Sequence, residues 1–575
     1  MDRRTLLALL LTAIVIVITP MLFPSSRRTS PPTDTIAVAQ RDSVRDTAPP
    51  PTPLVATPTP AQRQPTVSAA PPGGVVRAET TIVRTQHARY PIVSPGGTPA
   101  NVVLPEYESL RPGAASDTPV RLVEPNDRLI RLTLVSDRDT VALDNVAFRA
   151  EPQRREGDVI VQRMVSTTSP VPITLTYRAP VDSFVMRLEG TIGTAATDTD
   201  GGGDINRRLL VTLPARIRSE EADVGDDTRH LTIAYTNTPG EVETIGFGDL
   251  DTLVARVDTG PIRWVAARNK YFVVAVIPAG PDSAFRAIAT RGGPRTGSEA
   301  TAAQTTAFLP LSDNSFALRI YAGPQSWDHL RKTAASLENV NPYGGWMSAM
   351  VQPFSTIVMR MLLWMRHTFD VGYGWVLVIF GVAVRLLLWP LNQNAMRSSM
   401  KMQRLQPELA EIQKKYRDNP ERQRDAIMKV YQEHGMSPFS PLLGCLPMLL
   451  PMPILFALYF VFQNTIEFRG VSFLWLPDLS LRDPYFITPL FMGASMFLLS
   501  WIGMKGVPPT PQTKMMSYVM PVMFTVLFWN FASGLNLYYA VQNVAALPQQ
   551  WLLARERKAN KPPPDAPKGT KRDKK

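Results

Sequence analysis

Hydrophobic residues are distributed unevenly along the chain, and their pattern changes near residue 343. Between residues 76 and 340, polar and apolar residues alternate in segments such as RLIRLTLVSD, ITLTYRA, FVMRLEGTI and YFVVAVIPA, which Gly, Pro, Asp and Asn turns separate. A period of two is typical of half-buried strands, and many short strands predict a β-sandwich over residues 76–340. From residue 343 to residue 554, Leu, Met, Phe, Val and Trp dominate, so this part is predicted to lie in a membrane.

Six segments are predicted to span that membrane. The first, residues 1–23, has a basic start and an uncharged stretch from Thr5 to Phe23, close to the ~20 residues that cross ~30 Å of hydrocarbon. It offers no convincing small-x-small cleavage site, so we interpret it as an uncleaved signal anchor rather than a cleaved signal peptide. The other five spans are expected at about 371–391, 442–463, 485–503, 515–532 and 535–554.

The distribution of Lys and Arg gives the direction of these spans. Residues 393–440, the link near Lys505 and Lys514, and the tail 555–575 are all basic, and the positive-inside rule puts them in the cytoplasm. Both termini are then expected to be cytoplasmic. The β domain and the loop EFRGVSFLWLPDLSLRDP are expected outside.

Residues 343–367 are apolar enough to be mistaken for a further span. A span there would turn the basic segment 393–440 outward, against the same rule. Arg360, Arg366 and Pro353 also suit a helix that lies in the membrane interface better than one that crosses it. We therefore predict an interfacial amphipathic helix on the outer surface.

Two further segments have a distinct composition. Residues 24–75 are rich in Pro, Thr, Ser and Ala, which predicts a flexible linker. In residues 393–440, apolar residues recur at helical spacing, and the chain then breaks. Asn419 can cap a second helix, Pro420 suits its first position and Gly435 can end it, so we predict an antiparallel helical hairpin with a charged exterior.

The basic hairpin and the basic tail leave two alternatives open. They are either solvated connectors or docking elements for an anionic partner, such as ribosomal RNA or lipid headgroups, and the length and charge of both segments favour docking. The residues expected to make these contacts are Lys401, Arg404, Lys414, Lys415, Arg555, Arg557, Lys558, Lys571 and Arg572.

The sequence contains little that could support catalysis. Cys445 is the only cysteine, so no intrachain disulfide can form, and the five histidines are scattered without an HExxH pattern. The GGGD at 201–204 is a loop, because no P-loop Lys and Ser/Thr follow it. We therefore expect no metal, no cofactor and no enzymatic activity.

Arg385 stands alone in the apolar run FGVAVRLLLWPL. Between residues 442 and 553 no Asp or Glu is expected deep in a span, because Glu467, Asp478 and Asp483 belong to the outer loop. This composition argues against a proton- or sodium-coupled transporter. Two interpretations of Arg385 remain: its side chain snorkels to the cytoplasmic headgroups, or it faces a water-filled cavity in the cytoplasmic half of the membrane.

Four stretches resemble the YidC/Oxa family of membrane protein insertases in order, spacing and side chain. They are RLLLWPLNQNAMRSSMKMQRLQPELAEIQKKY, GCLPMLLPMPILFALYFVF, DPYFITPLFMGASMFL and MPVMFTVLFWNFASGLNLYYAVQNV. The resemblance covers about 343–554, and the anchor with its outer β domain is similar to the Gram-negative form. It implies a polytopic α-helical inner-membrane protein with six spans, a five-helix insertase core within 371–554 and an all-β periplasmic β-supersandwich.

The same resemblance implies a site. Arg385 matches the arginine of a hydrophilic groove that is open to cytoplasm and lipid. Tyr538 and Tyr539 match an aromatic pair on the client path, with Tyr539 expected to face it, and Met448 and Met520 are expected to complete the wall. Gly381 stands where relatives often carry a hydroxyl, which puts one client contact in doubt, and HGMSPFSPLLGC is longer than the usual approach to the second core span.

The implied function is the insertion and folding of inner-membrane proteins, alone or with the Sec translocon. The implied partners are nascent membrane protein clients, the Sec translocon, the ribosome, signal-recognition targeting factors and membrane lipids. Two alternatives are an inert assembly scaffold, in which Arg385 would be dispensable, and a polytopic envelope transferase. The transferase would need an acid, a Ser/His pair or a metal cluster near the membrane surface.

Overall fold

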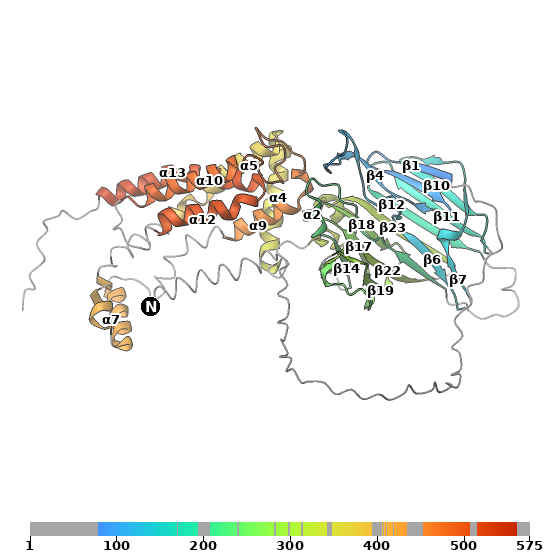
Figure 1. Cartoon of the computed structure of the whole chain (residues 1–575), viewed down its shortest axis with the longest axis horizontal. Coiled ribbons are helices and arrows are strands. Elements are labelled where there is room, and N and C mark those ends of the chain that lie inside the picture. Colours follow the sequence, from blue (N-terminus) through green and yellow to red (C-terminus); the bar gives the residue numbers. More distant parts are fainter. Residues whose placement is uncertain are drawn as a thin grey trace, which may run out of the picture. The chain divides into compact units, whose positions relative to one another are not determined.

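The structure, a computed structural model, describes residues 79–137, 139–169, 171–193, 207–237, 241–280, 283–296, 299–311, 314–341, 348–393, 405, 408–409, 411–417, 419–433, 452–505 and 515–559 (Figure 1). These residues all belong to one compact unit of the chain, Gly73–Lys575. The predicted signal anchor 1–23 and linker 24–75 lie outside the described residues.

The described residues of the β part form three larger antiparallel sheets and a short hairpin of β20 (Arg295–Thr296) and β21 (Glu299–Ala300). The ten-stranded sheet runs β15 (Glu243–Gly246), β14 (Thr232–Thr236), β17 (Trp264–Arg268), β18 (Phe272–Pro278), β23 (Ser315–Pro324), β12 (Val185–Ile192), β11 (Ile173–Pro180), β10 (Val159–Ser166) and β8 (Phe148–Ala150), with β9 (Arg154–Glu156) on β10. The six-stranded sheet runs β16 (Arg256–Ile262), β19 (Phe285–Gly292), β22 (Ala303–Pro310), β13 (Arg208–Thr212), β6 (Arg131–Val135) and β7 (Thr140–Ala142). The five-stranded sheet runs β1 (Glu79–Arg84), β2 (Arg89–Ser94), β4 (Val103–Glu108) and β5 (Pro119–Arg121), with β3 (Thr98–Pro99) on β2.

One hydrophobic core joins the three larger sheets. It contains Ile92 from the five-stranded sheet, Leu188 and Val274 from the ten-stranded sheet, and Leu132 and Ile288 from the six-stranded sheet. Strands that cover this core on one face, such as β11 and β22, alternate buried and more exposed residues. The antiparallel β architecture predicted from the alternation is therefore confirmed.

Three neighbouring strands, β14, β17 and β18, depart from the predicted alternation, because every residue in them is buried. β18 lies inside the ten-stranded sheet between β17 and β23, and all of its residues are buried. A strand that is covered on both faces selects a continuous apolar run rather than an alternating one. The period of two predicted for YFVVAVIPA is therefore wrong.

Short helices in the β part are η1 (Leu143–Asn145), α2 (Val224–Thr228), η3 (Phe247–Asp249), α3 (Trp327–Thr333) and η4 (Leu337–Asn339). The helical part contains α4 (Ser348–Phe369), α5 (Tyr373–Leu387), α7 (Pro420–Glu433), α9 (Met452–Asn464), η6 (Ile466–Phe468), α10 (Ile487–Gly503), the π-helix η7 (Met515–Val519), α12 (Met520–Leu527), η8 (Phe528–Asn530) and α13 (Ser533–Ala559). α13 packs against α5, α9 and α10, while α4 packs against α9.

Among the described residues, no helix taken alone has the length and apolar character needed to cross a bilayer. Within the described part of the chain, the pair Val351–Phe369 and Tyr373–Leu387 meets these criteria together, and the two helices are bent by 116° at the break between them. The number of spans therefore stays a prediction.

The start of α7 agrees with the sequence. The Asn419 side chain accepts a hydrogen bond from the Arg422 amide at 3.1 Å, and Pro420 is the first residue of the helix. A small core of Leu405, Leu409, Val430 and Tyr431 joins α7 to the segment before it. The predicted cap is confirmed, whereas the hairpin over 393–440 stays a prediction and Gly435 lies outside the described residues.

A loop between α9 and α10 contacts both cores; we call residues 465–470 the η6 joint. Ile466 belongs to the core of the β sheets, whereas Phe468 belongs to the core of the helices. Between them, Glu467 accepts a hydrogen bond from Ser326 at 3.3 Å, and burial raises the pKa of Glu467 to about 7. The Arg469 guanidinium donates to the Glu221 carboxylate at 2.8 and 3.0 Å, so this turn ties α9 and α10 to the β sheets.

His87 connects the five-stranded and ten-stranded sheets through Glu106 and Asp182, and we call these three residues the histidine staple. The two ring nitrogens of His87, before β2, lie 2.6 Å from Glu106 on β4 and 2.6 Å from Asp182 before β12. Both nitrogens can donate only when the ring is protonated. Burial alone would lower the pKa of His87, but the two carboxylates outweigh it and the pKa is raised.

We expect this staple to make stability depend on pH. Because the pKa of His87 is higher in the folded state than in the unfolded state, its contribution is complete at acidic pH and is lost as pH rises through the folded pKa. The thermal unfolding midpoint of the chain in detergent should fall less between about pH 6 and pH 9 for His87→Gln than for the wild type. An equal fall of the unfolding midpoint in the two proteins would contradict a pH-dependent contribution of the histidine staple to stability.

Candidate functional site

Arg385 lies in the last turn of α5, where α5 packs against α13. Its guanidinium donates a hydrogen bond to Oε1 of Gln549 on α13 at 2.8 Å. Among the described residues, no carboxylate forms an ion pair with Arg385, and its Nε is buried without a hydrogen-bond partner. The guanidinium is thus held by a neutral amide and keeps its net charge.

Gln549 is fixed on its other side as well. The side chain is 1% exposed, and its Nε2 donates to the Trp389 carbonyl at 3.1 Å and to Gln393 Oε1 at 3.2 Å. Gln549 is not among the site residues expected from the sequence. Its spacing of seven residues from Gln542 could have revealed it, because residues seven apart lie on one face of a helix.

Gln542 forms a similar contact two turns earlier. Its Nε2 donates to the Gly381 carbonyl at 2.9 Å and to the Tyr538 hydroxyl at 2.9 Å. Gly381 is buried, and a Cβ there would lie 3.0 Å from Val541 and 3.5 Å from the Tyr538 ring. A glycine therefore permits the close approach of α5 and α13, and whether residue 381 contacts a client stays a prediction.

The two tyrosines point to different neighbours. Tyr538 is 3% exposed and its ring lies 5.8 Å from the ring of Phe380 on α5. Tyr539 is more exposed, and its ring lies 5.5 Å from the ring of Phe528 on η8. The structure therefore brings Arg385, Gly381 and Tyr538 to one interface, while Tyr539 turns toward the end of α12.

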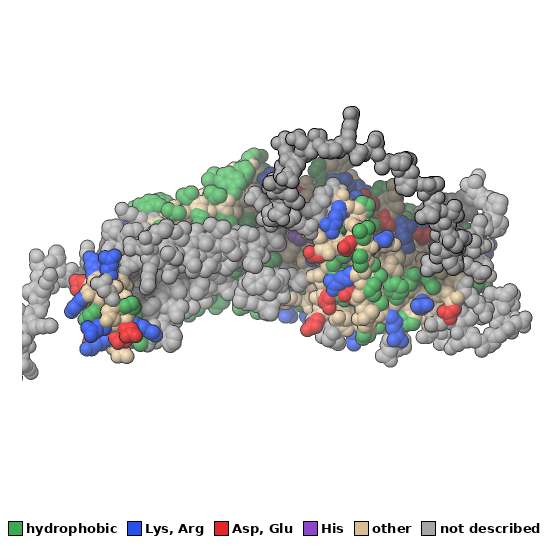
Figure 2. Space-filling view, turned by 60° about the horizontal axis from the view of Figure 1, so that its bottom comes forward, with side chains coloured by type: hydrophobic (Ala, Val, Ile, Leu, Met, Phe, Trp, Pro, Cys, Tyr) green, Lys and Arg blue, Asp and Glu red, His purple; other side chains and the backbone are tan. Residues whose placement is uncertain are grey.

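The other predicted site residues are more dispersed. Met520 is the half-buried first residue of α12, which packs on α10. Lys414 and Lys415 are exposed in the hairpin, and Figure 2 shows Lys and Arg side chains gathered around α7. Arg555 is exposed and lies 3.6 Å from the Trp551 ring, while Arg557 and Lys558 belong to α13. Met448, Lys401, Arg404, Lys571 and Arg572 lie outside the described residues.

The helices expose much apolar surface, as the space-filling view also shows (Figure 2). Leu386 and Leu387 on α5 are 61% and 72% exposed, and Val522 and Val526 on α12 are 65% and 68% exposed. Exposure of large aliphatic patches to water is unfavourable. Such patches therefore indicate contact with lipid or with another protein.

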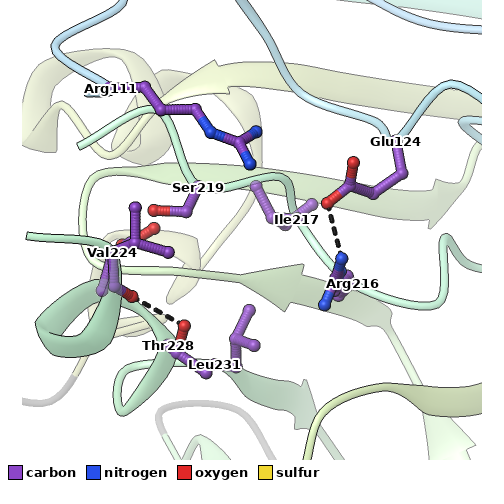
Figure 3. A pocket seen from close by; sticks show the side chains of 9 residues that line it. Arg111, Glu124, Arg216, Ile217, Ser219, Val224, Thr228 and Leu231 are labelled. Carbon is purple, nitrogen blue, oxygen red and sulfur yellow. Dashed lines mark hydrogen bonds and ion pairs between the residues drawn. The ribbon is translucent and has the colours of Figure 1, made fainter. Parts of the chain in front are cut away.

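A small polar hollow lies between α2 and neighbouring loops of the β part (Figure 3). Arg216 pairs with Glu124 there at 2.8 Å, and Thr228 donates to the Val224 carbonyl at 2.7 Å. Asp227 is held by the amide of Lys270 and by Asn269, each at 3.0 Å. These side chains already serve the local structure, so we do not assign the function to this hollow. Across the described residues, no group of three His, Cys, Asp or Glu could hold a metal ion.

Comparisons with known proteins give two matching families. The family described as "60Kd inner membrane protein" matches residues 364–561, and the family described as "YidC periplasmic domain" matches residues 80–357. The chain is 31% identical to "Membrane protein insertase YidC" of Prosthecochloris aestuarii over 405 residues, which are 66% of each protein. It is 34% identical to the protein of that name from Chlorobium phaeovibrioides over 354 residues, which are 57% of this chain and 58% of the relative. The matches thus span between about half and two thirds of these relatives.

A solved structure titled "Active YidC insertase crystal structure with the first transmembrane domain resolved" is 18% identical, with a TM-score of 0.32. The match covers 83% of this chain and 93% of that one.

Proposed function

Because the chain belongs to the YidC/Oxa family of membrane protein insertases, we propose that it inserts and folds inner-membrane proteins through a groove at Arg385. The observation that carries this proposal is the guanidinium of Arg385, which has a neutral partner and keeps its charge among apolar helices. A charge in this setting attracts water and acidic groups. A polar client segment could then enter the membrane at lower cost, and burial of the client's own apolar span would supply the free energy.

The proposed membrane arrangement has six spans. They are the anchor 1–23 and the five core spans within 371–554, with cytoplasmic termini and a periplasmic β-supersandwich over 76–340. We propose that 343–367 lies in the outer interface. The 116° bend between Val351–Phe369 and Tyr373–Leu387 supports this, as does an exposed stripe of Phe354, Ile357, Met361 and Trp364.

The hairpin 393–440 and the tail 555–575 are proposed to gather the cytoplasmic partners. The exposed Lys414, Lys415 and Arg555 could contact phosphates of ribosomal RNA or of lipid headgroups. Targeting factors and the Sec translocon are further proposed partners. The scaffold alternative assigns no role to the charge of Arg385, and the transferase alternative lacks a reactive group in the residues that we assign to the groove.

The client path is proposed to run along α5 and α13 and past Tyr539. A tyrosine there offers an apolar ring with a polar tip to a segment that leaves water. A photo-crosslinker at position 539 is expected to label a ribosome-stalled, single-span client. The matched control is position 522 on α12, where Val522 is 65% exposed and should mainly meet lipid. Client adducts at position 522 but not at position 539 would contradict a client path that runs past Tyr539.

A further inference from the structure

The geometry assigns Gln549 the role of a positioning residue: its neutral amide orients Arg385 without cancelling its charge, and thereby favours clients with acidic segments. This inference deepens the proposed function and rests on it. It follows from one set of contacts, in which a single side chain on α13 holds both the arginine and the segment that follows α5.

The orientation of the Gln549 amide is determined by its surroundings. Nε2 faces two acceptors, the Trp389 carbonyl at 3.1 Å and Gln393 Oε1 at 3.2 Å. An amide nitrogen only donates and an amide oxygen only accepts, so this arrangement directs Oε1 toward Arg385. Trp389 lies two residues after the end of α5, at the start of a further helical segment. Gln549 therefore fixes the start of this segment and the guanidinium together.

The neutrality of Gln549 is the essential feature. A carboxylate at this position would form a charge-assisted pair with Arg385, and such pairs are stronger in surroundings of low dielectric constant than in water. The pair would satisfy the guanidinium and leave little net charge for a client. An amide accepts one N–H and leaves the positive charge and the remaining donors free to act.

Gln542 provides a matched control on the same face of α13. It too donates through Nε2 to a backbone carbonyl, that of Gly381 at 2.9 Å, yet its other contact is Tyr538 and not Arg385. Changing either glutamine to glutamate removes a similar interhelical hydrogen bond. Only the change at 549 also puts a carboxylate beside Arg385.

The test compares Gln549→Glu and Gln542→Glu in the full chain, by insertion of two single-span clients that differ only in an acidic or a neutral translocated tail. A structural defect should lower insertion of both clients alike. We expect Gln549→Glu to lower the acidic-to-neutral ratio about tenfold, the effect of about 1.4 kcal/mol. The ratio should change much less for Gln542→Glu, because its carboxylate would contact Tyr538 rather than the Arg385 guanidinium.

Two outcomes overturn the inference in distinguishable ways. If Arg385→Ala lowers the ratio but Gln549→Glu does not, the proposed function stands and Gln549 is only structural. If neither variant changes the ratio, the role proposed for Arg385 fails as well. If the Gln549→Glu variant does not fold, Gln549→Met is used instead, because methionine accepts hydrogen bonds only weakly. An acidic-to-neutral ratio about twofold lower than in the wild type would then support the positioning role of Gln549, and an unchanged ratio would refute this role.

Discussion

Replacing Arg469 by alanine is expected to weaken the η6 joint by about 3–5 kcal/mol, the usual cost of removing one partner of a buried ion pair. The side chains of Arg469 and Glu221 are 4% and 6% exposed. The guanidinium also donates to the Glu220 carbonyl at 3.0 Å and lies 5.4 Å from the Phe272 ring. Alanine would leave the Glu221 carboxylate buried without its cation.

The effect should depend on pH in a defined direction. Burial raises the pKa of Glu221 to about 7, although Arg469 opposes this shift. A protonated Glu221 is neutral and does not need the Arg469 cation. The Arg469→Ala variant should therefore lose less stabilisation of the η6 joint at about pH 6 than at about pH 8. At the higher pH, hydrogen exchange of the amides at 466–470, measured in detergent, should be faster in the variant than in the wild type by roughly a hundredfold to several thousandfold.

Arg366→Ala is the matched control, because its partner Asp370 is 96% exposed and exposed pairs contribute little. Adding Glu221→Gln to Arg469→Ala should restore part of the protection, since no buried charge then lacks a partner. Protection that is unchanged in Arg469→Ala would show that the ion pair does not hold the joint.

Replacing Arg385 by alanine is expected to lower insertion of clients with acidic translocated tails by about tenfold or more, and to affect neutral clients less. Alanine removes the charge that attracts the acidic segment into the groove. Arg385→Lys should retain part of the activity, because a lysine keeps the charge but cannot reproduce the planar arrangement of donors. The measurement is rescue of client insertion in cells depleted of the wild-type protein.

Neutral clients serve as the internal control for expression and folding of the Arg385 variants. Equal rescue of acidic clients by Arg385→Ala and by the wild type would favour the alternative in which the arginine only snorkels to the headgroups. The hydrogen bond to Gln549 at 2.8 Å speaks for a fixed side chain instead.

Local sequence rules predicted the elements whose partners are close in the chain. The alternation in ITLTYRA corresponds to β11, and Asn419 caps α7 through the amide three residues later. These features depend on the side-chain period of a strand or on the first turn of a helix, so a short window contains the information. β18 was assigned the wrong period because its burial depends on layers supplied by distant strands.

The contacts that build the site and the joint could not be predicted in this way. Arg385 and Gln549 are 164 residues apart, and Arg469 and Glu221 are 248 residues apart. Glu467 was expected in an outer loop, but only the packed structure shows that Ser326 and the two cores bury it. Family resemblance identified Arg385 as a groove residue, but it did not reveal the side chain that orients it.

The most direct test of the proposed function uses the purified chain in liposomes without other proteins. A single-span client with an acidic tail is synthesised in their presence, and protease then digests every segment that has not crossed the membrane. We predict a protected tail fragment with the wild-type chain, and much less of it with Arg385→Ala. Equal protection in protein-free liposomes, or no protection with the wild-type chain, would contradict insertion through the Arg385 groove.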